Sequence, residues 1–249
     1  MVRLLVLLIG LALLLPAGVD FDTVDDILSC GSAADIDNMT PLTFAWRMRL
    51  DGSGESGPSG GYIFWKTDAA VTRYIYLYYQ GDSGQLRFKV QGASALYEQV
   101  WAMSTSTIPK TYVMVWDGGN IAGSTVLYEN GSLVSSAGGT FSAPGTRGDE
   151  DGNLEIGNRS SDTARTFNGV FSCMALWTAT ATANDIALLS HGGCRQTVQQ
   201  TSLGTPLRFW PMDQGQHGVA VGTVMDESGN VGHCTPSNNP AFEAIQVGY

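Results

Sequence analysis

Two neighbouring stretches of the chain carry tyrosines and cations at alternate positions, a pattern that could bind a ligand. The tyrosines are Tyr74, Tyr76 and Tyr78, and the cations are Arg87 and Lys89. A tyrosine ring can stack on the C–H face of a sugar while its polar tip bonds the sugar hydroxyls. Two other interpretations stay open. The cations could stabilise an exposed sheet by cation–π contact, or the face could contact another subunit, since Tyr and Arg are enriched at interfaces.

Two tryptophans are further candidates for ligand contact. Trp65 and Trp101 are expected to lie near loops, whereas Trp46, Trp116 and Trp177 fall on expected core strands and are assigned to packing. Tryptophans near loops are better placed to meet a ligand than tryptophans inside a core.

An acidic, glycine-rich loop is the candidate metal site. Ca²⁺ takes six to eight oxygen ligands, and four consecutive or nearly consecutive side chains could gather oxygens around it. They are Asp149, Glu150, Asp151 and Asn153. A solvated loop on the surface of an acidic protein explains the same residues. A second acidic group has the same two interpretations, and it comprises Asp20, Asp22, Asp25 and Asp26.

Catalytic machinery is not recognisable in the sequence. The three histidines lack metal-ligand spacing, no C-x-x-C motif occurs, and no Ser/His/Asp set or phosphate-binding glycine loop stands out. A glycoside hydrolase needs two carboxylates that flank the sugar bond. The acidic cluster at 149–151 lies in a glycine-rich loop without the alternation that would present carboxylates on one strand. We therefore expect no enzymatic activity.

The four cysteines predict two disulfides, because their number is even and the N-terminus looks secretory. They are Cys30, Cys173, Cys194 and Cys234. Of the three connectivities, we favour Cys30–Cys173 with Cys194–Cys234, since the first would join early and late strands and the second would hold the tail. Four free thiols in a reducing compartment are the alternative.

The tyrosine pattern predicts an antiparallel hairpin formed by residues 74–79 and 86–90. Both arms alternate apolar with polar or aromatic side chains. A register that sets Tyr76 against Lys89 leaves one face wholly apolar and makes the other aromatic and cationic. A slip of one residue would mix the two faces.

Short strands dominate the rest of the chain. Asn130-Gly131 suits the positive φ angles of a type I′ turn and predicts a second hairpin, 126–129 with 132–134. One short helix is expected over residues 182–191, capped by Thr182 and followed by Gly192. Further strands are expected at 42–50, 62–66, 112–116, 154–157, 170–177 and 207–211.

Composition agrees with an all-β protein. The 249 residues include 31 glycines, and only 14% are charged, where roughly 25% is usual. Hydrophobic residues make up 43%, which excludes wholesale disorder. The net charge of −10 excludes nucleic acid as a partner, because the chain has no basic excess to neutralise phosphates.

The N-terminus predicts secretion. Arg3 precedes an apolar run at 4–15, and residues 1–18 together resemble a signal peptide. The run is too short to span a bilayer, which takes about 20 residues, so we expect no transmembrane span. The alternative is a retained apolar segment that contacts another subunit.

The order of motifs resembles the laminin-G-like branch of the concanavalin A-like lectin/glucanase superfamily. The resemblance covers 19–192 and rests on four sequence motifs in order. The first is an acidic opening strand followed by Pro41-Leu42-Thr43-Phe44-Ala45-Trp46, and the second is Tyr112-Val113-Met114-Val115-Trp116-Asp117-Gly118. The third is Val126-Leu127-Tyr128-Glu129-Asn130-Gly131, and the fourth is Leu154-Glu155-Ile156-Gly157-Asn158 followed by Phe167-Asn168-Gly169 and the helix.

The resemblance implies a jelly-roll sandwich of two antiparallel sheets, with the short helix after the last core strand. The sandwich would occupy 19–202, and 203–249 would form a tail that adds an edge strand and a cystine-held loop to the same domain. Relatives often carry calcium near the edge of the sandwich. The family's enzymes carry an E-x-D-x-(x)-E strand, which is absent from this sequence.

Two functional interpretations follow. The first is a secreted, non-catalytic binding module for a glycan or a cell-surface protein. The second is a structural protein of an assembly of identical subunits, either a virion decoration or fibre component or an extracellular filament, with the apolar N-terminus as a subunit contact. A glycoside hydrolase is the weakest interpretation.

Overall fold

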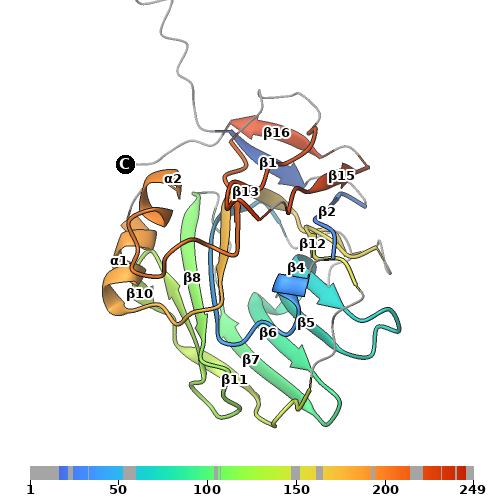
Figure 1. Ribbon diagram of the computed structural model, residues 1–249, viewed down its shortest axis with the longest axis vertical. Helices are drawn as coiled ribbons and strands as arrows, with labels where there is room; N and C mark the ends of the chain where they lie inside the picture. The colour runs from blue at the N-terminus through green and yellow to red at the C-terminus, as the bar shows by residue number, and fades with distance from the viewer. Residues whose placement is uncertain are drawn as a thin grey trace, which may run out of the picture.

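The chain folds into two antiparallel sheets packed face to face, which confirms the predicted all-β sandwich (Figure 1). The computed structural model describes residues 17–21, 25–32, 34–52, 60–103, 106, 108–146, 152–160, 165–191, 194–213, 221–230, 232–238 and 240–244. Residues 1–16 of the predicted signal segment 1–18 and the acidic stretch 149–151 lie outside the described residues, whereas Ala17 and Gly18 belong to the first strand, which begins at Ala17.

The first sheet contains eight strands within the described residues. Its order is β10 (Ser132–Leu133), β9 (Thr125–Glu129), β8 (Lys110–Trp116), β3 (Leu42–Leu50), β13 (Gly169–Trp177), β1 (Ala17–Phe21) and β16 (Ala241–Ala244), and β14 (Arg208–Trp210) also pairs with β13. The predicted Asn-Gly hairpin is confirmed, because Ser132 pairs with Glu129 and both turn residues have positive φ. The strand predicted at 112–116 is present as β8, which lies between β9 and β3.

In the described part of the chain the second sheet also contains eight strands, and it holds the tyrosine hairpin. Its order is β11 (Ser136–Thr140), β7 (Leu96–Ala102), β6 (Gln85–Gln91), β5 (Tyr74–Gln80), β4 (Gly61–Thr67), β12 (Glu155–Ile156), β2 (Ile27–Ser29) and β15 (Thr235–Ser237). The predicted register is confirmed: Tyr76 pairs with Lys89, and Leu77 pairs with Phe88. The sequence analysis missed β7, which completes this part of the sheet beside β6.

The core lies between the two sheets and is rich in aromatic rings. Phe44 of the first sheet meets Phe64 of the second edge to face, with ring centroids 5.0 Å apart. Phe44 also stacks on Trp46 at 4.8 Å. Each of these side chains is almost fully buried. Burial of this kind removes apolar area from water and is the main term that stabilises the sandwich.

Two helices cover the outer face of the first sheet: α1 (Ala183–His191), as predicted, and α2 (Cys194–Val198). Ile186 and Leu189 of α1 join the outward side chains Val113 and Ala175 in a second buried apolar cluster. The helices lie beside β8 and away from β4 to β7 (Figure 1).

The segment after α2 contributes strands to both sheets. β14 and β16 extend the first sheet, and β15 pairs with β2 in the second. Thr235 lies opposite Ser29, so the adjoining residues Cys234 and Cys30 also meet, and they form a disulfide. The predicted pairing Cys30–Cys173 with Cys194–Cys234 is therefore wrong. Cys173 is disulfide-bonded too, but it lies on β13 beneath the helices, on the other sheet.

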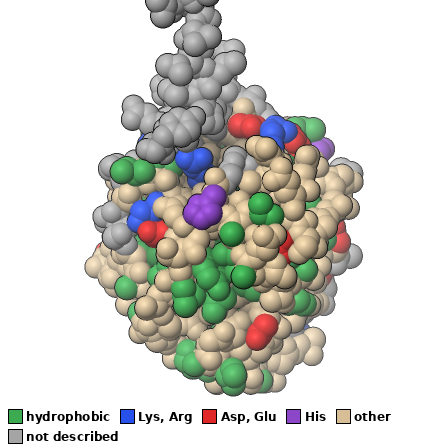
Figure 2. All heavy atoms as spheres, turned by 90° about the vertical axis from the view of Figure 1, so that its left-hand side faces the viewer, with side chains coloured by type: hydrophobic (Ala, Val, Ile, Leu, Met, Phe, Trp, Pro, Cys, Tyr) green, Lys and Arg blue, Asp and Glu red, His purple; other side chains and the backbone are tan. Residues whose placement is uncertain are grey.

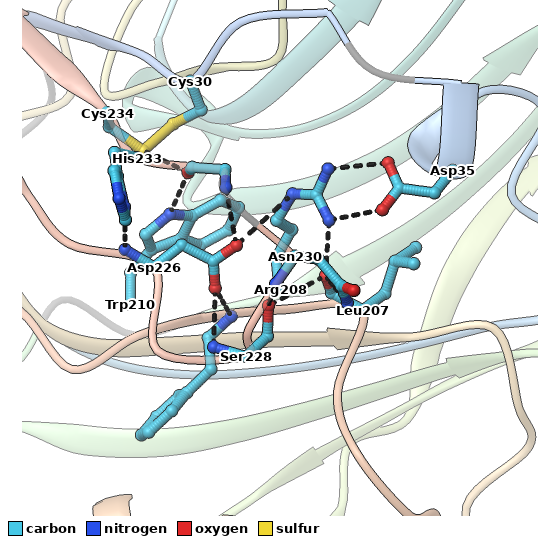
Figure 3. Close-up of polar contacts among 12 residues, drawn as sticks. Cys30, Asp35, Leu207, Arg208, Trp210, Asp226, Ser228, Asn230, His233 and Cys234 are labelled. Carbon is cyan, nitrogen blue, oxygen red and sulfur yellow. Dashed lines mark hydrogen bonds and ion pairs between the residues drawn. A yellow bond between two sulfur atoms is a disulfide. The ribbon is translucent and has the colours of Figure 1, made fainter.

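A buried ion-pair network holds the same segment in place (Figure 3). Arg208 on β14 is fully buried, and two of its guanidinium nitrogens donate to the carboxylate of Asp35, each at 2.6 Å. Its Nε lies 3.7 Å from the buried carboxylate of Asp226. Asp226 in turn accepts bonds from the backbone N–H groups of Phe209 and Gly232. The network joins the last strands to the loop before β3.

We expect Arg208→Met to lower the free energy of unfolding by about 3–5 kcal/mol, because it leaves the Asp226 carboxylate buried without its cation. Arg195→Met is the matched control: Arg195 pairs with Asp213 and Glu227 near the surface, and its loss is expected to cost about 1 kcal/mol or less. Urea unfolding measures both. Equal losses would show that the network around Arg208 adds nothing beyond a surface pair.

The start of α1 is held by a reciprocal cap. The Asp185 carboxylate accepts bonds from the backbone N–H and hydroxyl of Thr182, and the Asp185 N–H donates to the Thr182 hydroxyl. Ser202 donates to the same carboxylate through its N–H at 2.6 Å. Burial by itself would raise the pKa of Asp185, but the bonds from Thr182 and Ser202 outweigh it and lower the pKa below its ordinary value.

A lowered carboxyl pKa stabilises the fold at pH values above the pKa of the unfolded chain, about 3.9 for Asp. That stability is lost as the pH falls through the lower pKa of the folded state. We expect Asp185→Asn to destabilise the protein by about 1–2 kcal/mol at pH 7 and the difference to shrink steadily below about pH 4. Thermal unfolding of both proteins from pH 7 to pH 2 tests this, and a constant difference would contradict it.

Candidate ligand-binding face

The outer face of the second sheet carries a continuous aromatic cluster. Strand alternation turns Tyr74, Tyr76 and Tyr78 away from the core, and Tyr62 and Trp65 of β4 join them. We call this surface the aromatic face, and it comprises Tyr62, Trp65, Tyr74, Tyr76, Tyr78, Arg87 and Lys89. The cations lie on β6 beside the tyrosines, as the hairpin register requires.

A local irregularity of β4 brings its two aromatic rings to the same face. Tyr62 and Trp65 are three positions apart, so strict alternation would place them on opposite faces. A shift of register between Tyr62 and Phe64 inserts an extra residue and turns both rings outward. Alternation therefore could not predict Tyr62 as a site residue.

The rings of the aromatic face stack on each other. Trp65, Tyr74 and Tyr76 have ring centroids 5.0–5.3 Å apart and interplanar angles of 25–27°. Tyr76 also meets Tyr78 edge to face. As a result Trp65 is 2% exposed and Tyr76 is 8% exposed, whereas Tyr74 and Tyr78 are half-buried. Tyr74 and Tyr78 are thus the rings of this stack that solvent reaches best.

Ion pairs hold the two predicted cations against the rings. The Lys89 ammonium lies 5.9 Å from the ring centroids of both Tyr76 and Tyr78. Lys89 and Arg87 share one carboxylate, Glu98 of β7, at 3.2 and 3.1 Å. The cation–π contacts expected from the sequence are therefore present, and the ligand and subunit-contact interpretations remain predictions.

A loop that follows β12 brings two more cations to the face. The guanidinium carbon of Arg159 lies 5.1 Å from the ring centroid of Trp65 and 5.3 Å from that of Tyr62. Arg165 donates from Nη1 to the Tyr62 hydroxyl at 3.4 Å. Sequence analysis missed both arginines, because they lie more than eighty positions from the tyrosines and no local pattern marks them.

A buried amide positions this loop. The Asn158 side chain is fully buried, donates to the Thr166 hydroxyl at 2.9 Å and accepts the N–H of Arg159 at 2.8 Å. Ser160 N–H then donates to the Glu155 carboxylate at 2.9 Å. These bonds fix the backbone from which the Arg159 side chain extends across the rings.

The three tyrosine hydroxyls are neutral donors at physiological pH. Burial raises the pKa of Tyr74, Tyr76 and Tyr78, and nearby tyrosines and Glu98 raise it further. Within the part of the chain that the structure describes, none of these hydroxyls hydrogen-bonds to another protein group. They can therefore bond water or a ligand.

Of the two tryptophans predicted to contact ligand, only Trp65 lies on this face. Trp101 is in β7, pairs with Leu86 and points into the core at 1% exposure, so its predicted role is wrong. Neither residue lies near a loop as expected, since both occur within strands.

The predicted calcium site stays a prediction. Asp149, Glu150 and Asp151 lie outside the described residues, and the amide of Asn153 donates to the Ser29 hydroxyl at 3.2 Å. Among the described residues, no group of three or more His, Cys, Asp or Glu side chains could hold a metal ion.

The strands of this face carry two carboxylates, Glu98 on β7 and Glu155 on β12. Three strands separate β7 from β12 in the sheet, which puts the two carboxylates about 19 Å apart at ordinary strand spacing. Glycosidases place their carboxyl pair between about 5 and 9.5 Å apart. Glu98 and Glu155 therefore cannot act on one sugar bond together.

A separate hollow lies at the loop ends of the sandwich. It measures about 480 Å³, and its lining includes Asn38, Thr40, Asn120 and Pro144. Its lining is uncharged. The helix side of the molecule also shows few charges and a gathering of hydrophobic side chains (Figure 2). No described helix is long and apolar enough to cross a membrane.

The chain belongs to the concanavalin A-like lectin/glucanase superfamily, whose family model matches residues 24–187, more than half of the chain. The resemblance stated from the sequence motifs is thus confirmed. Comparison with curated protein sequences gives no match.

Solved structures with a similar fold share little sequence with this chain. The heptameric SAP-like pentraxin of Limulus polyphemus is 15% identical with a TM-score of 0.51, over 71% of this chain and 82% of the pentraxin. A candidate carbohydrate binding protein of Bacteroides ovatus ATCC 8483 is 14% identical with a TM-score of 0.56, over 94% of this chain and 62% of that protein. At these identities the likeness establishes the fold alone.

We expect Arg159→Ala to expose Trp65 and to raise the accessibility of tryptophan to acrylamide. All six tryptophans are at most 2% exposed in the intact protein, so a new quenchable component would report this one ring. The matched control is Arg195→Ala, which removes a cation of α2 that is not part of the aromatic face and pairs with Asp213. Unchanged quenching in Arg159→Ala would show that the guanidinium does not cover the cluster.

Proposed function

We propose that the chain is a non-catalytic, extracellular module that binds a glycan through the aromatic face. The observation that carries the proposal is a stacked aromatic cluster on the outer sheet face that no described helix covers, in which the hydroxyls of Tyr74, Tyr76 and Tyr78 hydrogen-bond to no other described protein group. Aromatic area joined to polar tips suits the mixed apolar and hydroxyl surface of a sugar.

Tyr74 and Tyr78 are the proposed contact residues. They are the more exposed members of the cluster, and Tyr62, Trp65 and Tyr76 pack behind or between them. The buried members would hold the contact rings in place, which limits the side-chain entropy that binding must remove.

The absence of catalysis is supported by the carboxylates of the face. Glu98 is held by Arg87 and Lys89, Glu155 is buried and accepts the Ser160 N–H, and the two stand about four strand spacings apart, about 19 Å. The candidate carbohydrate binding protein of Bacteroides ovatus has a similar fold and supports a binding role.

An extracellular location is supported by the disulfide Cys30–Cys234 and by a bonded Cys173, since disulfides persist mainly in oxidising compartments. The alternative role in an assembly rests on the low charge, the 31 glycines, the aromatic face as a subunit contact and the apolar run at 4–15. That apolar run lies outside the described residues.

The double variant Tyr74→Phe/Tyr78→Phe is expected to lower affinity for a bound glycan by about tenfold, because each lost hydroxyl removes a hydrogen bond while the stacked rings stay. A glycan array identifies the ligand, and titration calorimetry measures the loss.

Two control variants localise the effect. Tyr128→Phe alters a half-buried tyrosine on β9 of the other sheet, and Asn120→Ala alters the 480 Å³ hollow at the loop ends. Both are expected to bind as the unaltered protein does. Loss of binding in Asn120→Ala with full binding in the double phenylalanine variant would move the site to the hollow and overturn the assignment to the aromatic face.

A further inference from the structure

We propose that the aromatic face takes an extended oligosaccharide, a trisaccharide or a longer chain, which lies along strand β5. This inference rests on the proposed function and names the class of its ligand. It is argued from the spacing and burial of the tyrosines that the strand presents.

The two proposed contact rings stand too far apart for one sugar. Tyr74 and Tyr78 are four positions apart on one strand, so their Cα atoms lie about 13 Å apart at ordinary strand rise. The ring of Tyr76 lies between them, with centroid distances of 5.0 Å to Tyr74 and 5.4 Å to Tyr78. Each of these steps is close to the length that one pyranose unit adds to an extended chain. The row therefore matches a chain that contacts the protein through alternate units.

The middle ring of the row is mostly buried. Tyr76 is 8% exposed, because Trp65 stacks on it at 5.0 Å and Tyr62 meets it edge to face at 5.3 Å. Tyr74 and Tyr78 on either side are half-buried. A compact ligand centred on Tyr76 would miss the two better exposed rings, whereas a chain along the strand contacts both.

Polar side chains accompany the row along its whole length. Each tyrosine has a polar residue opposite it on β6: Gln91 opposite Tyr74, Lys89 opposite Tyr76 and Arg87 opposite Tyr78. Glu98 pairs with both cations, and the amide nitrogen of Gln91 donates to the carbonyls of Gly92 and Ala95. Polar groups repeated at the strand period suit a polymer that repeats its hydroxyls along its length.

A chain that crossed β5 at an angle would use the row differently. It would pass from the rings of β4 to the polar side chains of β6 and contact one end of the row, leaving the other contact tyrosine unused. The two directions therefore predict different effects when Tyr74 and Tyr78 are changed one at a time.

The test measures affinity against chain length. Titration calorimetry is run with neutral oligomers of glucose, xylose, mannose and N-acetylglucosamine, each from the monosaccharide to the hexasaccharide. In at least one series we expect affinity to rise about tenfold from the monosaccharide to the trisaccharide, because the longer chain adds a second contact position. Beyond the trisaccharide we expect little further change, since the row is then filled.

Single variants at the two ends of the row test the direction of the chain. Tyr74→Phe and Tyr78→Phe each remove one hydroxyl and keep the ring, and each is expected to lower affinity for the trisaccharide about threefold. Affinity for the monosaccharide is expected to stay nearly unchanged in either variant, because a single sugar can bind at the other end.

Tyr79→Phe is the matched control on the same strand. Tyr79 faces the core at 1% exposure, and its buried hydroxyl bonds to no described group. The variant is expected to bind every oligomer as the unaltered protein does. Weaker binding in Tyr79→Phe would show that loss of a hydroxyl anywhere on β5 disturbs binding, and it would overturn the assignment of Tyr74 and Tyr78 as two contact positions.

The outcomes separate the two proposals. A rise with chain length that both end variants reduce would support the inference. Equal affinity for the monosaccharide and all longer chains, or a trisaccharide affinity that depends on one end tyrosine alone, would overturn the inference and leave glycan binding in place. Binding of no oligomer in any series and of no glycan on the array would overturn the proposed function and the inference with it.

Discussion

The pairing of β5 with β6 is the constraint on which the rest of the structure depends. Because side chains alternate along each strand, one register sends Leu77 and Phe88 into the sandwich and turns Tyr76 and Lys89 outward. The same choice therefore fills the core and creates the aromatic face. A shift by one residue would bury a lysine and expose a phenylalanine, so the energy of the core fixes the composition of the outer surface.

The aromatic face is nevertheless assembled from distant parts of the chain. β4 supplies two rings through a bulge, β7 supplies the carboxylate that pairs both cations of β6, and the loop after β12 supplies Arg159 and Arg165. Asn158 holds that loop by bonds to its own neighbours. The rings therefore pack against each other as core residues do, although they lie on the outer face of the sheet. Tyr76 is buried by this packing, so it supports Tyr74 and Tyr78 more than it could contact a ligand itself.

The last strands play a different part, because they tie the two sheets together at one end. β14 and β16 belong to the first sheet and β15 to the second, so one segment crosses between the layers. The Cys30–Cys234 disulfide and the Arg208 network with Asp35 and Asp226 fasten this segment to early parts of the chain. The disulfide and the Arg208 network lie near the β2–β15 edge of the second sheet, and β11 forms the opposite edge. The aromatic face lies on the strands between these two edges, so neither the disulfide nor the network covers it.

The sequence by itself determined the features that depend on local alternation and turn chemistry. These are the all-β class, the tyrosine hairpin with its register, the Asn130-Gly131 turn and the helix capped by Thr182. Only the tertiary structure decided which distant residues meet. Trp101 faces the core because β7 pairs with β6 in a register that sets Trp101 opposite the core residue Leu86. Cys30 bonds to Cys234 because β15 pairs with β2. Period and propensity are properties of neighbouring residues, whereas strand order and loop placement are set by the packing of the whole chain.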